Sequence, residues 1–357
     1  TRLIVNNDTC NACHDNLEFH GEARFDIEYC VTCHNPYSID GDTVNEPWGG
    51  TVDMKQMIHK IHGNDNFDHQ LANGYFIFGF NDTLHDYTDV KWTQDVRNCG
   101  TCHQDSNTAV PQASNWRTVQ NRAACGSCHD DIDWAAGDHP GGIVFTDDSL
   151  CANCHSETSG PTGLQVREVH RQPEREAGER FQFNILSISN TAIGEFPVVE
   201  FSVTDPTNGD APYDIQNDSE FTTCTFGLSR LAIGIAWDTA DYHNNDSGKN
   251  PGLGLSMNPL SGCGGTSTAV GGGVFSVTSP VAVPATAGGS LAVKIDGHPA
   301  VDIDGSLERI AVTNAVKYAA ITDAEAVPRR NAVAITKCND CHNQLAMHGN
   351  NRTDNIE

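Results

Sequence analysis

Six copies of one cysteine–histidine pattern carry the chemistry that the sequence predicts. Each copy reads Cys-x-x-Cys-His, and in chain order the cysteines and histidines are Cys10, Cys13 and His14; Cys30, Cys33 and His34; Cys99, Cys102 and His103; Cys125, Cys128 and His129; Cys151, Cys154 and His155; and Cys338, Cys341 and His342. Two thiols at this spacing can each form a thioether with one vinyl group of a haem, and the histidine that follows then binds the iron. Paired cysteines also bind zinc, but zinc does not require a histidine directly after the second cysteine. The pattern therefore predicts six attachment sites for haem c and no catalytic residue.

The histidines outside the pattern are the candidates for the second axial ligand of each iron. The chain has 16 histidines and only 4 methionines, so ligation by two histidines is predicted for these haems. The predicted distal ligands are His20, His59, His62, His139, His170 and His348. His20 lies too close to His14 in the sequence to share an iron with it, so it is expected to serve another haem. No distal ligand is assigned to the haem at Cys338.

Four further histidines are expected to have other roles. A surface or hydrogen-bonding role is favoured for His69 and His85, although either could substitute for a distal ligand. His243 and His298 are expected not to bind iron.

The composition and hydrophobic pattern change along the chain, and this change predicts the elements that position these residues. Up to about residue 170 the haem segment is expected to have sparse, mostly helical or irregular structure. One helix is predicted there, because Met54, Met57, Ile58 and Ile61 recur at helical spacing before Gly63, and this helix carries His59 and His62. Between 171 and 331, β-like runs separated by Gly-, Pro- and Asn-rich turns predict an all-β domain, either a split barrel or a sandwich. The predicted strands lie at 181–185, 198–203, 231–237, 273–278, 291–295 and 310–318.

Two cysteines lie outside the haem pattern, in the β-like segment. Cys224 and Cys263 are predicted to form a disulfide, with two redox-active free thiols as the alternative. A stretch rich in Asp and Asn from Asp238 to Asn250 could bind calcium, although a solvated loop is the favoured interpretation.

An internal repeat defines the domain organisation. The pattern C-N-x-C-H-x-x-L-x-x-H-G-x-x-R occurs at residues 10–24 and again at 338–352, at an offset of 328 residues. The predicted domains are therefore a five-haem domain at 1–170, a β domain at 171–331, and the start of a second multihaem domain at 332–357. We expect the chain to be a fragment of a longer protein, with a filament subunit that shares its last haem with a neighbouring chain as the alternative.

Composition limits the partners. The chain carries 47 acidic and 21 basic residues, a formal net charge of −26, which disfavours binding to nucleic acid and to anionic lipid headgroups. Covalent attachment of haem c implies a location outside the cytoplasm.

The clustered motifs, the repeated CxxCHxxLxxHGxxR unit and the Met57–His62 helix resemble the outer-membrane decahaem cytochromes of the MtrC/OmcA type. The resemblance implies two five-haem domains alternating with β-barrel domains, and a cell-surface location through a lipid anchor outside this chain. It implies electron transfer from an outer-membrane porin–cytochrome conduit, or from other multihaem cytochromes, to metal oxides, soluble metals or flavins. The wide spacing of Cys224 and Cys263 departs from the short disulfide loop of that type, so a flavin-linked role does not carry over to it. A multihaem reductase is the alternative function.

Overall fold

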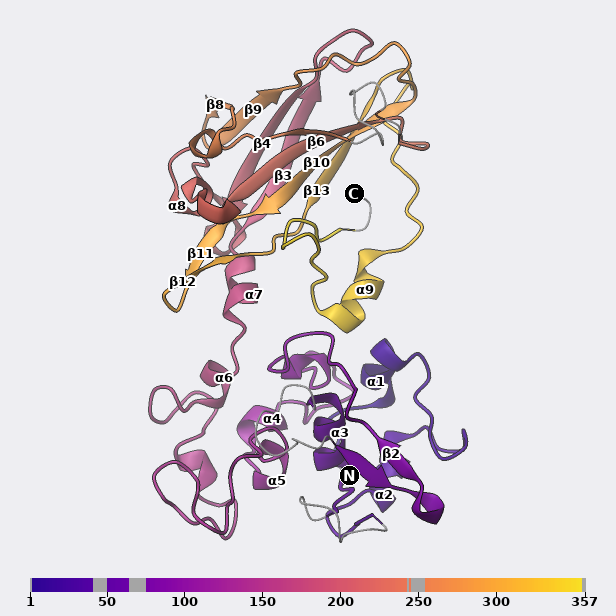
Figure 1. Ribbon diagram of the computed structural model, residues 1–357, viewed down its shortest axis with the longest axis vertical. Coiled ribbons are helices and arrows are strands. Elements are labelled where there is room, and N and C mark those ends of the chain that lie inside the picture. Colours follow the sequence, from indigo (N-terminus) through magenta and orange to yellow (C-terminus); the bar gives the residue numbers. More distant parts are fainter. Residues whose placement is uncertain (1, 41–49, 64–74, 243, 245–253, 355–357) are drawn as a thin grey trace. The chain divides into compact units, whose positions relative to one another are not determined.

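In a computed structural model of the chain, the structure describes residues 2–40, 50–63, 75–242, 244 and 254–354. The chain forms two compact units, which are coloured from indigo to yellow along the sequence in Figure 1. The first unit comprises residues 1–172 with 340–343, and the second comprises 173–339 with 344–357.

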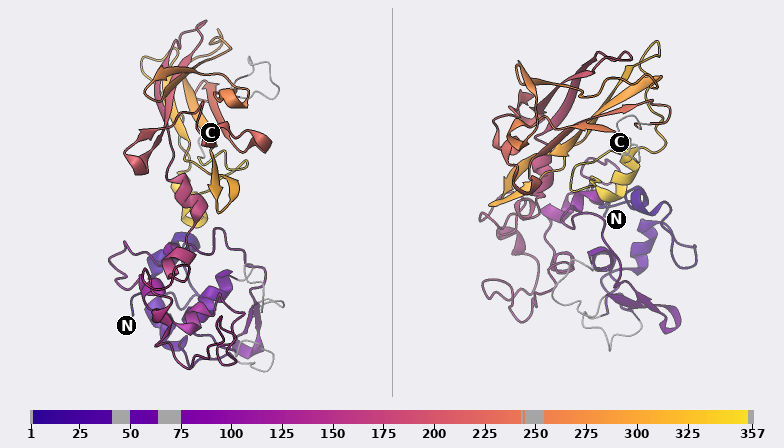
Figure 2. Two further views of the ribbon diagram at one scale, coloured as in Figure 1. Left: turned by 90° about the vertical axis from the view of Figure 1, so that its left-hand side faces the viewer. Right: turned by 45° about the horizontal axis from the view of Figure 1, so that its top comes forward.

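The first unit consists of short helical segments joined by irregular chain, as two further views show (Figure 2). Its helices are α1 (Asn7–His14), α2 (Ile27–Cys33), α3 (Met54–Gly63), α4 (Asn115–Thr118), α5 (Arg122–Cys125) and α6 (Val166–Val169), with 3-10 turns at Phe80–Asp82, Cys99–Thr101 and Cys151–Asn153. A small hairpin pairs β1 (Phe76–Phe78) with β2 (Leu84–Asp86). The predicted helix over Met54–Ile61 is therefore present as α3.

The apolar core of the first unit is very small. Among its described residues, the buried hydrophobic side chains are those of Ile27, Tyr75, Val110 and Ala113, whereas the second unit buries 26. Several large apolar side chains of the first unit are instead exposed, and Tyr37 is 94% exposed. A chain of this length needs a larger apolar interior to fold. Burial of protein side chains alone therefore does not explain the stability of this unit.

The second unit is built on two antiparallel sheets. One has the strand order β13 (Ala315–Ala320), β10 (Ser290–His298), β6 (Arg230–Trp237) and β7 (Leu255–Met257). The other has the order β3 (Gln182–Ser189), β4 (Val198–Asp205), β9 (Val274–Thr278) and β8 (Thr268–Gly271), with β5 (Ala211–Pro212) pairing with β4. A hairpin of β11 (Ala300–Ile303) and β12 (Ser306–Arg309) and the helices α7 (Pro173–Gly178) and α8 (Ser219–Thr222) complete this part, and α9 (Ile335–His342) follows it. The prediction of an all-β domain is confirmed (Figure 1).

The hydrophobic core of this unit includes residues of both sheets. Phe201 of β4, Ile233 and Trp237 of β6 and Leu291 of β10 are all at most 1% exposed. Fully burying side chains of this size contributes about 1.5–3 kcal/mol each.

Strands β6 and β10 depart from simple alternation because both of their faces are covered. At Gly234 of β6 an added Cβ would lie 2.8 Å from the side chain of Lys294, so the aliphatic part of that lysine covers the outer face. The predicted strand at 310–318 begins only at Ala315, because the backbone of Ile310 bonds to Pro299 and Asn314 is used in side-chain contacts.

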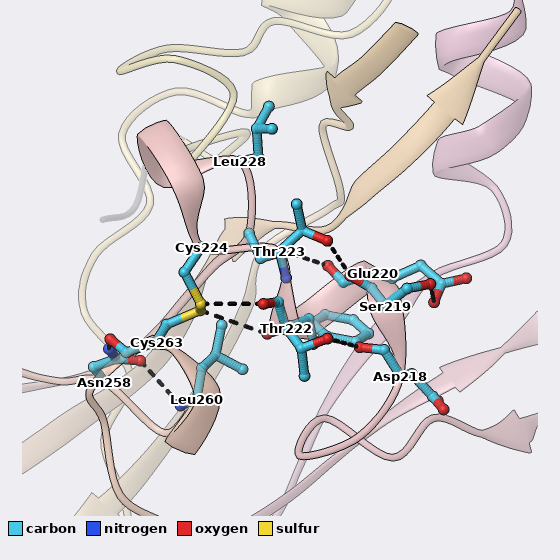
Figure 3. Close-up of a disulfide and its surroundings, with 12 residues drawn as sticks. Asp218, Ser219, Glu220, Thr222, Thr223, Cys224, Leu228, Asn258, Leu260 and Cys263 are labelled. Atoms are coloured by element: carbon cyan, nitrogen blue, oxygen red, sulfur yellow. Dashed lines mark hydrogen bonds between the residues drawn. A yellow bond between two sulfur atoms is a disulfide. The ribbon is translucent and has the colours of Figure 1, made fainter. Parts of the chain in front are cut away.

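A disulfide joins Cys224, just after α8, to Cys263, with their Cα atoms 5.3 Å apart (Figure 3). The Asn258 side chain fixes the second partner, since its Nδ2 donates to the carbonyl of Cys263 and its Oδ1 accepts from the Leu260 amide, each at 3.0 Å. Leu260 and the neighbouring Phe221 are fully buried, so the bridge links two core segments of the β unit.

Within the described ranges, none of the helices combines the length and the apolar character that crossing a bilayer requires.

Candidate haem sites

Each attachment motif occupies one helical turn or its end. The backbone N–H of the motif histidine donates to the carbonyl of the first cysteine in four of the motifs, with N···O distances of 2.8–2.9 Å for His34, His103, His129 and His155. This bond between residues i and i+4 brings the first cysteine, the second cysteine and the histidine to one side of the turn. All twelve motif cysteines are free of disulfides. The motifs therefore present two thiols and one imidazole together, as thioether attachment of a haem requires.

Five motif histidines each face one histidine from outside the motifs. The pairs and the distances between ring centres are His14 with His62 at 5.9 Å, His34 with His20 at 6.0 Å, His103 with His59 at 6.3 Å, His129 with His170 at 6.3 Å, and His155 with His139 at 5.9 Å. An iron held between two imidazole nitrogens by bonds of about 2 Å sets the ring centres about 6 Å apart. The spacing of the rings therefore fits a metal between them, and the exposed apolar side chains of this unit fit a bound porphyrin.

The helix α3 serves two of these pairs. His59 and His62 are three positions apart on it, and they face His103 and His14 respectively. A single amphipathic segment thus supplies the facing histidine for two separate motifs.

Backbone carbonyls orient five of these ten rings. The Nδ1 atoms of His34, His62, His139, His155 and His170 lie 2.8–3.1 Å from the carbonyl oxygens of Val52, Ile58, Pro140, Leu164 and Val166. A carbonyl requires Nδ1 to carry the proton, which leaves Nε2 with a free electron pair for a metal. The tautomer of these rings is therefore the one that an iron ligand needs.

Burial keeps several of the rings neutral. It lowers the pKa values of His59, His62 and His129 below the ordinary value, and it lowers the pKa of His103 to about 4, with His59 beside it adding to the effect. A charged imidazole cannot bind iron, so the low pKa values favour the state that can.

The three described tryptophans of the first unit contact the distal candidates. Trp92 lies edge-on to His62 with ring centres 5.3 Å apart, while Trp116 and Trp134 lie 6.2 Å from His170 and 5.9 Å from His139. Sequence reasoning missed these residues, because no local spacing connects them to the histidines.

Residues around the second motif line one pocket. It is lined by His20, Arg24, Tyr29, Cys30, Cys33 and His34. The facing histidine, both thiols and the motif histidine thus surround one hollow.

The two copies of the internal repeat have the same local structure. Helices α1 and α9 begin and end at equivalent residues, 328 positions apart. In each copy an asparagine side chain accepts from a leucine amide, at 2.7 Å from Asn11 to Leu17 and at 2.8 Å from Asn339 to Leu345.

The loop that carries the second histidine of the repeat also has the same conformation in both copies. His20 has φ 56° and His348 has φ 55°, in the left-handed region that non-glycine residues rarely adopt. The bridges Phe19–Arg24 and Met347–Arg352 close the two loops in the same way.

The remaining predicted residues have other positions. In the part of the chain that the structure describes, no histidine ring faces His342 or His348. His85 is exposed beside Gly79, and His298 is buried with its Nδ1 2.9 Å from the carbonyl of Leu228. His69 and His243 lie outside the described residues, as does most of the stretch Asp238–Asn250 in which calcium was considered. No cluster of three metal-binding side chains occurs elsewhere in the described ranges.

Residues 340–343, which include Cys341 and His342 of the last motif, belong to the first unit. Thr93 Oγ1 and Gln94 Nε2 donate to the carbonyl of Cys341 at 2.5 and 3.1 Å, and Cys13 Sγ lies 3.3 Å from the carbonyl oxygen of Asp340. Within this unit, residues 340–343 therefore lie beside the first motif, whereas Cys338 belongs to the second unit.

Motifs of this kind, with histidines facing them at this distance, are the arrangement that a c-type cytochrome requires. The family of outer membrane cytochromes described as MtrC/MtrF-like, domains II/IV, matches residues 2–171, and this part of the chain belongs to that family. The resemblance to the MtrC/OmcA type that the sequence predicts is confirmed.

Solved structures share the fold. MtrC from Shewanella baltica OS185 is 20% identical with a TM-score of 0.64, and the match covers 100% of this chain and 53% of that one. The outer membrane decaheme cytochrome OmcA is 20% identical with a TM-score of 0.63, and the match covers 99% of this chain and 53% of that one. The chain thus spans about half the length of these structures. Comparison with the curated proteins gives no match.

Proposed function

We propose that the chain is an electron carrier that binds haem c at its six motifs and holds five of the irons between two histidines. The observation that carries this proposal is the set of five histidine pairs, each joining one motif histidine to one other histidine at 5.9–6.3 Å. The distal ligands are then His62, His20, His59, His170 and His139, in the order of the motifs. His348 is proposed to serve a haem of the second multihaem domain.

The chain's own residues have three tasks in this function. The thiols would hold the haem, the paired histidines would bind its iron, and backbone carbonyls hold Nδ1 of five of these rings so that Nε2 is free for the metal. Iron with two histidine ligands exchanges one electron between the ferric and ferrous states, at a lower potential than iron with a methionine ligand. With a histidine available on each side of the iron in these five sites, a bound haem would have no open position for a small substrate, which disfavours a reductase.

We further propose extracellular electron transfer at the outer membrane. The name of the matching family, outer membrane cytochromes, supports this location. The donors would be a porin–cytochrome conduit or other multihaem cytochromes, and the acceptors would be metal oxides, soluble metals or flavins. The net charge of −26 favours cationic metal species over nucleic acid as partners.

Two measurements on the purified protein test the proposal. A pyridine haemochrome assay should give six haems per chain, and electron paramagnetic resonance (EPR) should show low-spin ferric haems with two histidine ligands. A haem count well below five would overturn the carrier function, and a high-spin signal from one of the five paired sites would favour a reductase. Anaerobic mixing of the reduced protein with a flavin or a soluble ferric complex should reoxidise it, and no reaction with either would refute these acceptors.

A further inference from the structure

Arg24 carries a positive charge in the first unit and has no carboxylate partner among the described residues. It lines the pocket with His20, Tyr29, Cys30, Cys33 and His34, and its guanidinium carbon lies 5.9 Å from the centre of the Tyr29 ring. Among the residues that the structure describes, it forms no ion pair.

Other arginines of the same unit behave differently. Arg97 pairs with Asp95, Arg117 with Asp105 and Glu157, Arg122 with Asp148, and Arg167 with Glu157. In a chain with 47 acidic residues, a half-buried arginine with only an aromatic ring as a side-chain partner is unusual. The site around Arg24 is therefore one that an anion from outside the protein chain can complete.

The backbone fixes Arg24 relative to the facing histidine. Phe19 N donates to Arg24 O at 2.9 Å and Arg24 N donates to Phe19 O at 3.3 Å, which closes the loop that carries His20. Positive φ angles at His20, Gly21 and Glu22 turn the chain tightly within this loop. The histidine and the arginine are thus presented by one rigid turn to one pocket.

The second copy of the repeat offers an equivalent arginine. Arg352 closes its loop through the same two bonds with Met347. Its Nε is buried and makes no hydrogen bond, and it lies 3.8 Å from Oδ2 of Asp296. Arg230 and Lys294 also contact Asp296, so Arg352 shares this buried carboxylate with two other cations.

We propose that Arg24 is a positioning residue that binds a propionate carboxylate of the haem attached at Cys30 and Cys33, and that Arg352 does the same for the haem that His348 serves. Haem propionates are the anions that a haem protein brings to such a pocket, and a guanidinium binds a carboxylate through two parallel hydrogen bonds. The HGxxR unit then holds its haem at two points: the histidine binds the iron, and the arginine binds a propionate. This inference rests on the proposed function.

The charge of Arg24 has a measurable consequence for that haem. A nearby cation favours the reduced iron, which carries one positive charge less, and it keeps the propionate ionised. Arg24→Gln should lower the equilibrium constant for reduction of one haem about tenfold, which corresponds to about 59 mV for one electron. It should also make that potential depend on pH between about 6 and 8, because the propionate loses its partner.

The experiment is a spectroelectrochemical titration of the full-length holoprotein at several pH values, with haem content measured for each variant. Arg24→Lys keeps the charge and should retain most of the wild-type potential. Tyr29→Leu removes the stacking partner and should leave the potential unchanged. Arg167→Gln removes an equal charge from an arginine that already has a carboxylate, and it serves as the matched control.

The outcomes separate the inference from the function. An unchanged potential in Arg24→Gln would overturn the inference, as would the same shift in the lysine, leucine or control variants. If Arg24→Gln loses one haem while Arg24→Lys keeps it at the wild-type potential, the charge is required and the inference stands. If both variants lose it, the inference is wrong. A wild-type protein without low-spin haems would instead refute the proposed function itself.

Discussion

Removal of the disulfide between Cys224 and Cys263 should destabilise the β unit while leaving the haem sites unchanged. The perturbation is the double substitution Cys224→Ser and Cys263→Ser. The bridge closes a loop with a sequence separation of 39 residues, and it connects segments next to the fully buried Phe221 and Leu260.

The size of the effect follows from the loop length. A cross-link of this length restricts the unfolded chain by about 4 kcal/mol at 25 °C in the chain-entropy account. The second unit contains about 180 residues, and for domains of this size each kcal/mol shifts the melting temperature by about 2–4 °C. We therefore expect the melting temperature of this unit to fall by roughly 8–16 °C.

Hydrogen exchange measured by mass spectrometry can show that the β unit is the part of the chain that loses stability. The amides of β6 and β10 should exchange through global opening of the β unit, and their free energy of opening should fall by about 4 kcal/mol. Each single substitution also breaks the bridge and should lose a similar amount. The Soret spectrum and the haem count serve as internal controls.

Two results would refute this reasoning. A loss below about 1 kcal/mol would mean that the bridge does not constrain the unfolded chain as the loop length requires. A shift of haem potentials on mild reduction of the bridge, without loss of stability, would instead support a redox role for these cysteines.

Three further substitutions test other parts of the structure. His62→Met should raise the potential of one haem and keep it low-spin in EPR, because methionine ligation raises the potential; an unchanged potential would contradict ligation by His62. Burial lowers the pKa of His298 to about 4, so the unfolded chain binds a proton first as the pH falls, and the free energy of unfolding should decrease by about 3 kcal/mol between pH 7 and 4. Urea unfolding of His298→Gln should lack this part of the pH dependence, and an identical slope would refute it. Asn314→Ala should destabilise the β unit by about 2–3 kcal/mol, because it removes the bonds to Ile295 and Thr353; faster exchange at 347–353 is the measurement, and unchanged exchange would contradict it.

The sequence predicts local features of this protein well, because spacing along the chain determines them. The motif turns, the helix α3 and strands such as β4 and β6 depend on residues a few positions apart. The sequence also predicts six distal candidates, and five of them face a motif histidine, but it does not predict which motif each one faces. His59 faces His103 and His62 faces His14 across long stretches of chain, and no local pattern encodes such a pairing.

Two other sets of features are not predicted from the sequence. The strands β11 and β12 are four residues each and carry no strong alternation. The contacts of Trp92, Trp116 and Trp134 with distal histidines depend on tertiary packing.

The repeat shows how one local sequence is completed by different surroundings. In the first copy, Asn7 of α1 holds the chain after the histidine loop, since its Nδ2 donates to Phe25 O at 2.6 Å and its Oδ1 accepts from Ile27 N at 2.9 Å.

In the second copy the equivalent position is Ile335, which cannot make these bonds. Asn314 of the β unit instead bonds the chain two positions earlier, since it donates to Asn351 O at 3.1 Å and accepts from the amide of Thr353, at positions equivalent to Ala23 and Phe25. The amide thus moves from the haem module's own helix to the neighbouring β unit, while the loop itself keeps its backbone angles. The β unit therefore stabilises the loop that carries His348. The placement of that histidine depends on the buried Asn314, whose contribution to stability can be measured.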